Sequence, residues 1–186
     1  YYRISVKRED QGVVSSYLHD IVKEGDVLSV SAPAGDFVLN ESNDPIVLIS
    51  GGVGLTPMAS MLHTIVEQQP NREVTFIHGA LNSHVHALKE EIAELANKYD
   101  NVKQYVAYSE PTNEDKEAKN FDKEGFIDLE WLKSIVQSES EFYFCGPVPF
   151  MKMMYRSLKE WGVSLDKIHF EFFGPAGELE EEPVAI

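Results

Sequence analysis

The sequence predicts an α/β fold in which a helix-covered sheet of parallel strands follows part of an antiparallel β-barrel. Three observations support this fold class. From about residue 46 onward, short apolar runs alternate with segments of helical periodicity, as in βαβ units. A glycine-rich turn follows the first of these apolar runs. The first 40 residues instead show the alternation of side chains typical of β-strands.

The composition excludes several classes of partner. The chain has 186 residues, 43% of them hydrophobic and 25% charged, which is enough for one large or two small domains. A formal net charge of −15 predicts a surface that repels nucleic acid and anionic membranes, so we expect neither as a partner. The single cysteine excludes an internal disulfide and fits a reducing compartment. No signal peptide or membrane-length apolar segment is visible, so we expect a cytoplasmic protein.

The first 40 residues resemble a piece of a larger domain. Strands are predicted at residues 1–7, 27–31 and 37–39, and a helix at 14–22 with Ser15 or Ser16 as its N-cap. Three strands and one helix neither close a barrel nor cover a sheet. The chain also begins within a predicted strand and without an initiator methionine. We therefore expect a fragment or processed product of a longer protein.

The second part of the chain begins after a boundary at residues 41–45. Its strands are expected at 46–50, 74–78, 102–107, 142–145 and 168–173, and its helices at 56–68, 87–99, 129–136 and 150–161. A long acidic loop is expected over 110–123, and an acidic tail over 176–186. In such sheets ligands bind beyond the carboxyl ends of the strands. The segments that follow the strands are therefore expected to line one crevice.

The glycine-rich turn is the strongest single motif. A turn of this kind lets backbone N–H groups approach a pyrophosphate, and the helix behind it adds partial positive charge. Proline suits the first helical turn, where its missing N–H leaves no bond unmade. A plain tight turn between strand and helix remains the alternative, because short glycine motifs occur in many proteins. The motif consists of Gly51, Gly52, Val53, Gly54, Leu55, Thr56 and Pro57.

Four motifs in order carry a resemblance to a known family. They are Gly12–Leu18, Gly51–Pro57, Phe142–Pro147 and Phe170–Pro175. Their order and spacing resemble the ferredoxin-reductase-like flavoenzymes, and most of all the reductase part of bacterial flavohaemoglobins, which are nitric oxide dioxygenases. The resemblance implies that residues 1–43 are the C-terminal part of an FAD-binding β-barrel. It also implies that residues 44–175 form an NAD(P)-binding α/β domain.

The resemblance places flavin contacts at both ends of the chain. Gly12 and Ser15 match the flavin-pyrophosphate loop, although the residues alone favour a capped surface helix. Glu171 matches a carboxylate near the flavin, and Phe173 an aromatic ring that covers the isoalloxazine. Core packing is the alternative for the phenylalanines. The matching segment at this end comprises Glu171, Phe172, Phe173, Gly174 and Pro175.

The resemblance places nicotinamide-dinucleotide contacts on the glycine-rich turn, where Thr56 would offer its hydroxyl and N–H. Cys145, Gly146 and Pro147 match the turn beside the nicotinamide, and we expect Cys145 to pack there without reacting. His78 has either a catalytic or ribose-binding role or that of a hydrogen-bonded histidine. His84 and His86 lack a third ligand nearby in the sequence, so we expect no metal site.

The activity implied is transfer of a hydride from NADH to FAD and of electrons to the haem of a globin domain outside this chain, which would convert nitric oxide to nitrate. Two alternatives stay open. One is a stand-alone flavin or ferredoxin reductase, or the reductase component of an oxygenase. The other is a non-catalytic nucleotide-binding regulatory subunit, against which the flavin-type ending at residues 171–175 argues.

Two features qualify the cofactors. Ser109 is followed by Glu110, where NADP-preferring relatives carry basic residues, so we expect NADH rather than NADPH as the donor. The family's Arg-x-Tyr-Ser flavin motif is absent, which leaves the FAD site incomplete. We therefore expect weak or no FAD binding by this chain, and self-association through the open edges of the partial barrel.

Overall fold

The computed structural model describes residues 2–173. Contacts divide the chain into two units, Tyr1–Val38 and Leu39–Ile186, which are described separately. The sequence-expected tail at 176–186 lies outside the described residues. No described helix is long and apolar enough to cross a membrane.

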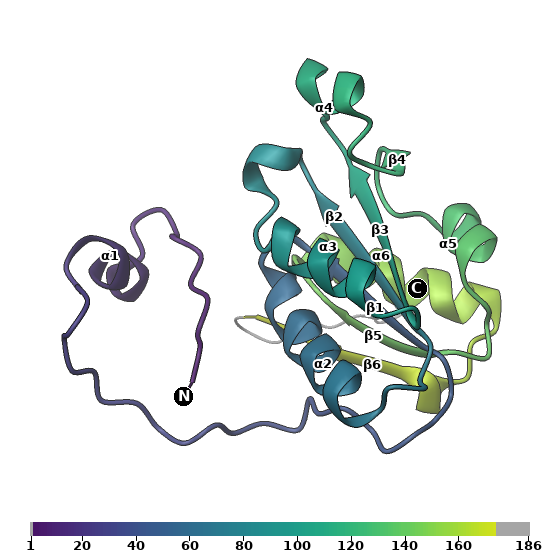
Figure 1. The fold of residues 1–186 in the computed structure, drawn as a ribbon, viewed down its shortest axis with the longest axis horizontal. Coiled ribbons are helices and arrows are strands. Elements are labelled where there is room, and N and C mark those ends of the chain that lie inside the picture. Colours follow the sequence, from purple (N-terminus) through teal and green to yellow (C-terminus); the bar gives the residue numbers. More distant parts are fainter. Residues whose placement is uncertain (1, 174–186) are drawn as a thin grey trace, which may run out of the picture. The chain divides into compact units, whose positions relative to one another are not determined.

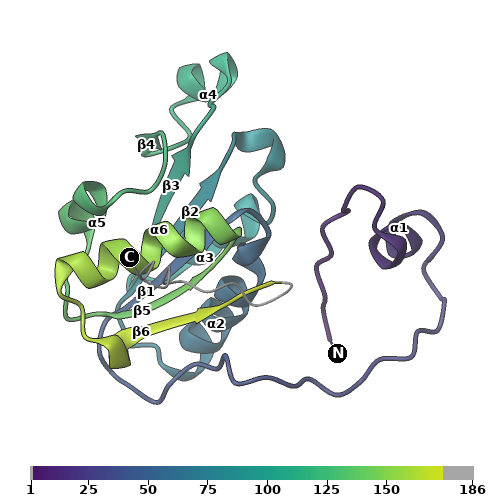
Figure 2. The same cartoon turned by 180° about the vertical axis from the view of Figure 1, so that it is seen from behind.

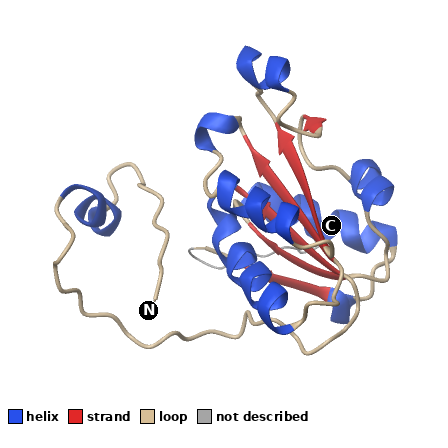
Figure 3. Ribbon diagram, in the orientation of Figure 1, coloured by secondary structure: helices blue, strands red, loops and turns tan. Residues whose placement is uncertain are grey.

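The second unit contains one sheet of six parallel strands (Figures 1 and 3). The strands are β1 (Ile46–Gly51), β2 (Val74–Ala80), β3 (Val102–Tyr108), β4 (Lys123–Glu124), β5 (Glu141–Cys145) and β6 (Ile168–Glu171). Their order is β4-β3-β2-β1-β5-β6. The chain therefore builds outward from β1 on one side, then returns to start again at β5 on the other. This reversal makes the β1–β5 boundary the topological switch point, where ligands bind in open α/β sheets.

Helices cover both faces of the sheet. The longer ones are α2 (Leu55–Gln68), α3 (Lys89–Lys98), α5 (Leu129–Ile135) and α6 (Val148–Trp161). Two views from opposite sides show α2 and α3 on one face and α5 and α6 on the other (Figures 1 and 2). The predicted α/β class with a parallel nucleotide-binding-type sheet is confirmed for this unit.

Alternating side chains divide the core between the two faces. On the α5/α6 face, Val47 and Ile49 of β1 pack with Phe142 and Phe144 of β5 and with Met154 of α6, all of them buried. The residues between them point to the α2/α3 face, because successive side chains of a strand alternate. Every residue of β1 and β5 is buried, as expected for central strands of a sheet covered on both faces.

The predicted acidic loop at 110–123 is wrong in part. Residues Asn113–Ala118 form the short helix α4, whose N-cap is Thr112. Thr112 Oγ1 accepts a hydrogen bond from Asp115 N at 3.1 Å, and an Asp115 carboxylate oxygen accepts one from Thr112 N at 3.0 Å. This reciprocal pair is a capping box with aspartate in place of the commoner glutamate, so a helix start was legible here. The two-residue strand β4 was also not predicted.

The first unit contains the helix α1 (Val13–Asp20), and its predicted strands are not formed in the structure. Residues 2–7, 27–31 and 37–39 have no ladder partners among the described residues. The partial antiparallel barrel is therefore not shown. The physical reason is that a strand forms only when it has a hydrogen-bonding neighbour and a core on which its apolar side chains can pack. In the described part of this unit neither is present, and Val27 is 95% exposed. The N-cap of α1 is Gly12, not Ser15 or Ser16.

A buried arginine fastens the start of the second unit to its sheet. Arg72 is 2% exposed and its guanidinium donates to the carbonyl of Asp44 at 2.8 Å and to the side chains of Gln69 at 3.0 Å and Asn40 at 3.2 Å. The backbone N–H of Asn40 in turn donates to the hydroxyl of buried Tyr143 at 3.0 Å. Because a buried guanidinium needs its donors satisfied, this network fixes the segment that leads into β1.

Candidate functional site

The site is built where β1 and β5 end beside each other. Ser50 and Cys145 are partners in the parallel register of these strands. After β1 the chain turns through a single 3-10 turn, η1 (Gly52–Gly54), and enters α2 without an intervening loop. Gly52 has φ +52°, a left-handed conformation that glycine adopts without strain. The sequence predicted a helix that starts at Thr56, whereas α2 begins one residue earlier, at Leu55.

Gly54 is the point at which this turn touches the end of β5. A methyl group on Gly54 would overlap the carbonyl group of Cys145 and lie 2.6 Å from Gly146 N. Gly146 is also confined, although by a side chain, because a Cβ there would lie 2.6 Å from the ring of Phe150. The two motifs predicted separately from the sequence are thus in backbone contact. Glycine at position 54 is required by packing between strands, and not only by the approach of a ligand.

The amino ends of two helices lie at this edge of the sheet with their N–H groups uncapped by side chains. Neither α2 nor α6 has a side-chain N-cap or an acidic residue in its first turn. Such ends attract anions through the unpaired N–H groups and the helix dipole. Thr56 Oγ1 donates within the turn to Val53 O at 3.3 Å, so its hydroxyl proton is engaged before any ligand binds. Pro57 lies in the first turn of α2, as predicted.

Cys145 and Glu171 are register partners at the carboxyl ends of β5 and β6. Cys145 is fully buried, and burial, together with the nearby Glu171 carboxylate, raises the pKa of its thiol to about 12. The thiol is therefore protonated and unreactive at neutral pH. Phe172 packs in part against the α5/α6-side core, with its ring 6.0 Å from that of Phe170. Phe173 is 45% exposed, which separates it from the core-packing alternative.

His78 lies inside the molecule. It is 1% exposed, and its Nδ1 is 2.8 Å from Ser50 Oγ. Its ring lies against that of His86, tilted by 35° with 4.4 Å between centroids, and His86 Nδ1 is 2.9 Å from the hydroxyl of Tyr108. His78 is thus buried and hydrogen-bonded through Nδ1 to Ser50, whereas its Nε2 has no partner among the described residues. Within residues 2–173 no group of three or more His, Cys, Asp or Glu side chains is arranged to hold a metal ion.

The segments after β2 and β3 are tied to each other. Ser109 N donates to Ala80 O at 3.0 Å, and Glu110 N donates to Leu81 O at 2.8 Å. Asp115 in α4 also accepts a hydrogen bond from Ser83 N at 3.3 Å. Burial acts to raise the pKa of the Asp115 carboxyl, but its hydrogen bonds from Ser83, Thr112 and Asn120 together hold that pKa well below the ordinary value. Asp115 thus remains a charged acceptor that fixes both loops.

Gly12 and Ser15 belong to the first unit, at the amino end of α1. Ser15 Oγ accepts a hydrogen bond from Glu9 N at 3.2 Å and donates to Gly12 O at 3.3 Å. The hydroxyl is thus used to close the turn before the helix. The first-turn N–H groups of α1 have no side-chain cap, so they fit a phosphate better than the Ser15 hydroxyl does.

The predicted site residues that the structure describes fall into three groups. The second unit brings to one edge of the sheet the turn at 51–57, the turn at 145–147, Ser109, Glu171, Phe172 and Phe173. His78 lies beneath that edge, and Gly12 and Ser15 lie in the other unit. Gly174 and Pro175 lie outside the described residues. The sequence did not mark Phe150 or Tyr108, and it raised His86 only as a possible metal ligand, because their places depend on strand register and on a loop that no local pattern marks.

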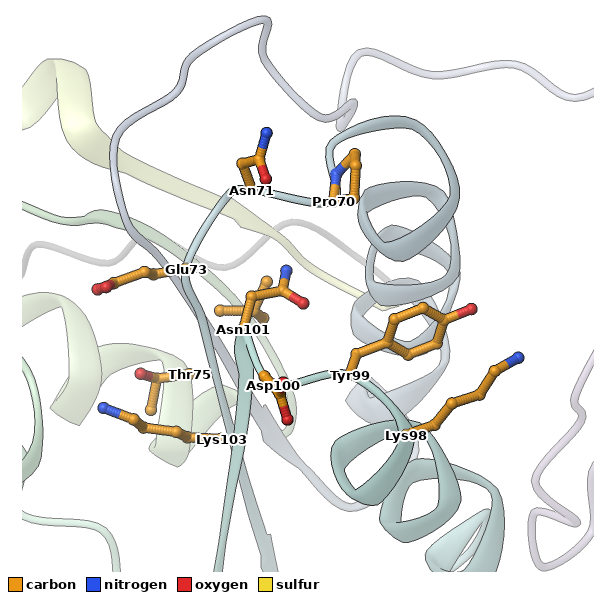
Figure 4. Close-up of a pocket in the computed structure, with 10 residues that line it drawn as sticks. Pro70, Asn71, Glu73, Thr75, Lys98, Tyr99, Asp100, Asn101 and Lys103 are labelled. Carbon is orange, nitrogen blue, oxygen red and sulfur yellow. The ribbon is translucent and has the colours of Figure 1, made fainter.

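A hollow at the opposite end of the sheet does not belong to this site. It is lined by Pro70, Asn71, Glu73, Val74, Thr75, Lys98, Tyr99, Asp100, Asn101 and Lys103 (Figure 4). These residues surround the amino ends of β2 and β3, whereas the glycine-rich turn follows the carboxyl end of β1. Side chains of both charges line it, two lysines and two acidic residues, and they do not point toward a common centre. Ligands of open α/β sheets bind at the other edge.

Comparison with known proteins identifies the family to which this fold belongs. The family model of the oxidoreductase NAD-binding domain matches residues 48–156. The chain belongs to this family. The structure also resembles the FAD/NAD-binding domain of nitric oxide dioxygenase from Vibrio cholerae, with a TM-score of 0.82 and 38% identity over 91% of this chain and 70% of that one.

Among relatives of this oxidoreductase NAD-binding chain are two bacterial flavohemoproteins. That of Bacillus anthracis is 59% identical and that of Bacillus subtilis 49% identical, each over 97% of this chain. The chain spans 46% and 45% of these relatives, which is less than half of their length. The resemblance stated from the four motifs is confirmed.

The backbone contact at position 54 predicts an asymmetric effect of two alanines in one turn. Gly54→Ala should lower the free energy of unfolding by about 3 kcal/mol or more, because the backbone of Cys145 must move. Gly52→Ala should lower it by about 1 kcal/mol, because only a left-handed φ opposes it and nothing lies within 4 Å of the added carbon. Urea unfolding of both variants measures the difference. Equal losses would contradict the packing role of Gly54.

The buried histidines predict acid sensitivity. Burial and neighbouring charges lower the pKa of His78 to about 3 and that of His86 to about 4. For His78 the neighbour is His86, and for His86 Lys89 lowers the pKa whereas Glu90 raises it. As the pH falls from about 6.5 to about 4, the unfolded chain binds protons that the folded protein does not. The free energy of unfolding should therefore fall over this window, by up to about 1.4 kcal/mol per pH unit for each histidine.

Comparing variants isolates this effect from the titration of carboxylates. His86→Phe should be less stable at pH 7 but should show a shallower loss between pH 6.5 and 4.5 than the unmodified chain. His84→Asn is the matched control, because His84 is exposed in the same loop. Urea unfolding at several pH values gives the slopes. If His86→Phe keeps the full slope, His86 is not the group that resists protonation.

Proposed function

We propose that this chain is the reductase part of a flavohemoprotein and that it passes a hydride from NADH to FAD. Electrons would then reach the haem of a globin domain in the whole protein, which would convert nitric oxide to nitrate. The observation that carries the proposal is the glycine-rich turn, held against the end of β5 at the switch point, in a chain of the oxidoreductase NAD-binding family. The relatives named above favour this over a stand-alone reductase or a regulatory subunit.

The dinucleotide is proposed to lie across the carboxyl edge of the sheet. Backbone N–H groups of the turn at 51–57 and the amino end of α2 suit its diphosphate. The turn at 145–147 suits the nicotinamide, with the protonated Cys145 thiol filling space behind it. Ser109 and the loop after β2 suit the adenosine half. His78 is too deeply buried to touch the ligand directly.

Residues of this chain are also proposed to hold FAD. Gly12, Ser15 and the amino end of α1 suit its pyrophosphate, and Glu171, Phe172 and Phe173, followed by Gly174 and Pro175, suit the ring. The chemistry that FAD would supply is acceptance of a hydride and release of single electrons. The exposed Phe173 ring would shield that group from water and would have to yield to nicotinamide.

The flavin site fits only in part. Residues 2–38 carry no strand, although a barrel would be needed to hold the ring, and Val13, Val27 and Val30 are exposed. We infer that residues 1–43 complete the barrel in the whole protein, with 44–175 as the nucleotide-binding domain. In this chain alone the exposed apolar residues would favour self-association. The cytoplasm is the proposed compartment.

The first test is an absorbance scan of the purified chain with added FAD, followed by anaerobic NADH. We expect FAD to be retained weakly or not at all, whereas calorimetry should detect NAD⁺ binding. Binding of NAD⁺ without flavin supports a nucleotide-binding part whose flavin site is completed elsewhere. Stoichiometric flavin that bleaches with NADH would contradict the weak-FAD inference but support hydride transfer. Absence of NAD⁺ binding would overturn the proposed function.

Nucleotide preference is a separate prediction. The acidic side chain of exposed Glu110 should oppose the 2′-phosphate of NADPH, and Lys116 is already paired with Glu124 at 2.8 Å. We expect tighter calorimetric binding of NAD⁺ than of NADP⁺. Glu110→Gln should improve NADP⁺ binding by up to about fivefold, as expected for one exposed charge, and should leave NAD⁺ binding unchanged. A clear preference of the unmodified chain for NADP⁺ would contradict the prediction.

A further inference from the structure

Four buried polar side chains form a continuous row under the carboxyl edge of the sheet. Ser50 Oγ lies 2.8 Å from His78 Nδ1, and the His78 ring lies against the His86 ring, tilted by 35° with centroids 4.4 Å apart. His86 Nδ1 lies 2.9 Å from the Tyr108 hydroxyl. All four residues are buried, and none is more than 7% exposed. We call Ser50, His78, His86 and Tyr108 the polar row.

The polar row joins three segments that the proposed function assigns to the dinucleotide. Ser50 directly precedes the glycine-rich turn, and Tyr108 directly precedes Ser109. His86 lies between them, in the loop that leads from β2 to α3. The register of β1, β2 and β3 places Ser50, His78 and Tyr108 on one face of the sheet. The row therefore connects the diphosphate side of the crevice with its adenosine side.

Packing alone does not explain these residues. Two positions earlier on the same face, β1 and β2 carry Leu48 and Phe76, both fully buried. Among the described residues, the Nε2 atoms of His78 and His86 are buried without a hydrogen-bond partner. Leu88, two residues after His86, has a left-handed backbone with φ +53°. Unpaired buried polar atoms and strained backbone are rare in native proteins, and strained backbone clusters at functional sites.

Charge attraction does not explain the polar row either. Burial lowers the pKa of both histidines, so the rings are neutral at physiological pH and add no charge toward a phosphate. The charged groups that act on His86 are Lys89 and Glu90, and the pKa of Tyr108 is raised to about 12 by burial and by the Asp115 and Glu90 carboxylates. What the row can supply is direction, because each neutral group accepts or donates in a fixed geometry.

We propose that the polar row is a positioning device that presets the glycine-rich turn, the loop after β2 and the Ser109 segment for the adenosine diphosphate half of the dinucleotide. The proposal rests on the proposed function and deepens it. None of the four residues touches the ligand; each acts by fixing the backbone that does. The nicotinamide half, at the end of β5, lies outside the row.

Tyr108→Phe tests the proposal with the smallest change, because it removes one hydroxyl and keeps the ring. With the full chain, calorimetry is done with 5′-AMP and NAD⁺, and nicotinamide mononucleotide is titrated by NMR. We expect about tenfold weaker binding of AMP and NAD⁺, with binding of nicotinamide mononucleotide unchanged within about twofold. Tyr105→Phe is the matched control, since Tyr105 lies on the same strand but packs against Trp131, 6.2 Å away on the α5/α6 side.

The double variant Ser50→Ala/Tyr108→Phe tests whether the row acts as a unit. If it does, the double variant should lose about the same tenfold affinity for AMP as Ser50→Ala alone or Tyr108→Phe alone. Two independent residues would together lose about a hundredfold. Independent losses, equal weakening of nicotinamide mononucleotide, or AMP affinity unchanged in Tyr108→Phe would each overturn the proposal. Those results leave the proposed function standing, because the unmodified chain still binds NAD⁺. Failure of the unmodified chain to bind either AMP or NAD⁺ would remove both.

Discussion

The contact between Gly54 and the backbone of Cys145 and Gly146 is the constraint on which the rest of the site depends. It allows β1 and β5 to run side by side up to their last residues although both turn at once into helices. With a side chain at position 54, the strands would have to separate at their carboxyl ends or α2 would have to start later. Either change would move the uncapped end of α2 away from the end of β5. The absence of a side chain at position 54 thus allows both the direct passage from β1 into α2 and the close contact between the two turns.

A second feature of the sheet is the change from apolar to polar residues along one face. Leu48 and Phe76 pack like any core residues, whereas Ser50 and His78 in the next row exchange a hydrogen bond. Buried polar side chains stabilise the fold less than well-packed apolar ones do, but their hydrogen bonds fix one arrangement of the backbone. The cost falls at the strand ends, where the chain leaves regular structure and sheet hydrogen bonds no longer fix the backbone.

Much of the second unit could be predicted from sequence because its signals are local and strong. The apolar runs of β1 and β5, and the helical spacing of Met58, Leu62 and Ile65, each determine their element without knowledge of the neighbours. Helix α4 was missed although Thr112 and Asp115 form a capping box, because the acidic composition suggested a loop. Here the capping box at the helix start determined the structure more than the acidic composition of the segment did.

The remaining features depend on contacts between distant residues. Strand-like alternation in residues 1–7 and 27–31 did not produce strands, because a strand exists only with a hydrogen-bonding neighbour. His86 was considered for a metal site beside His84, but its structural partners are His78 and Tyr108, eight and 22 positions away in the sequence. No local pattern encodes such a pairing. The register of three parallel strands and the path of one loop together determine it.

The uncapped amino ends of α2 and α6 have a kinetic consequence for an acidic protein. The attraction of a helix end for an anion fades within about one turn, while the net charge of −15 acts over the whole surface. An incoming dinucleotide would be repelled until it is almost seated, so long-range steering would not speed its arrival. Added salt should therefore quicken association by screening the repulsion while leaving the rate of departure nearly constant. In such a site selectivity arises at contact and not during approach.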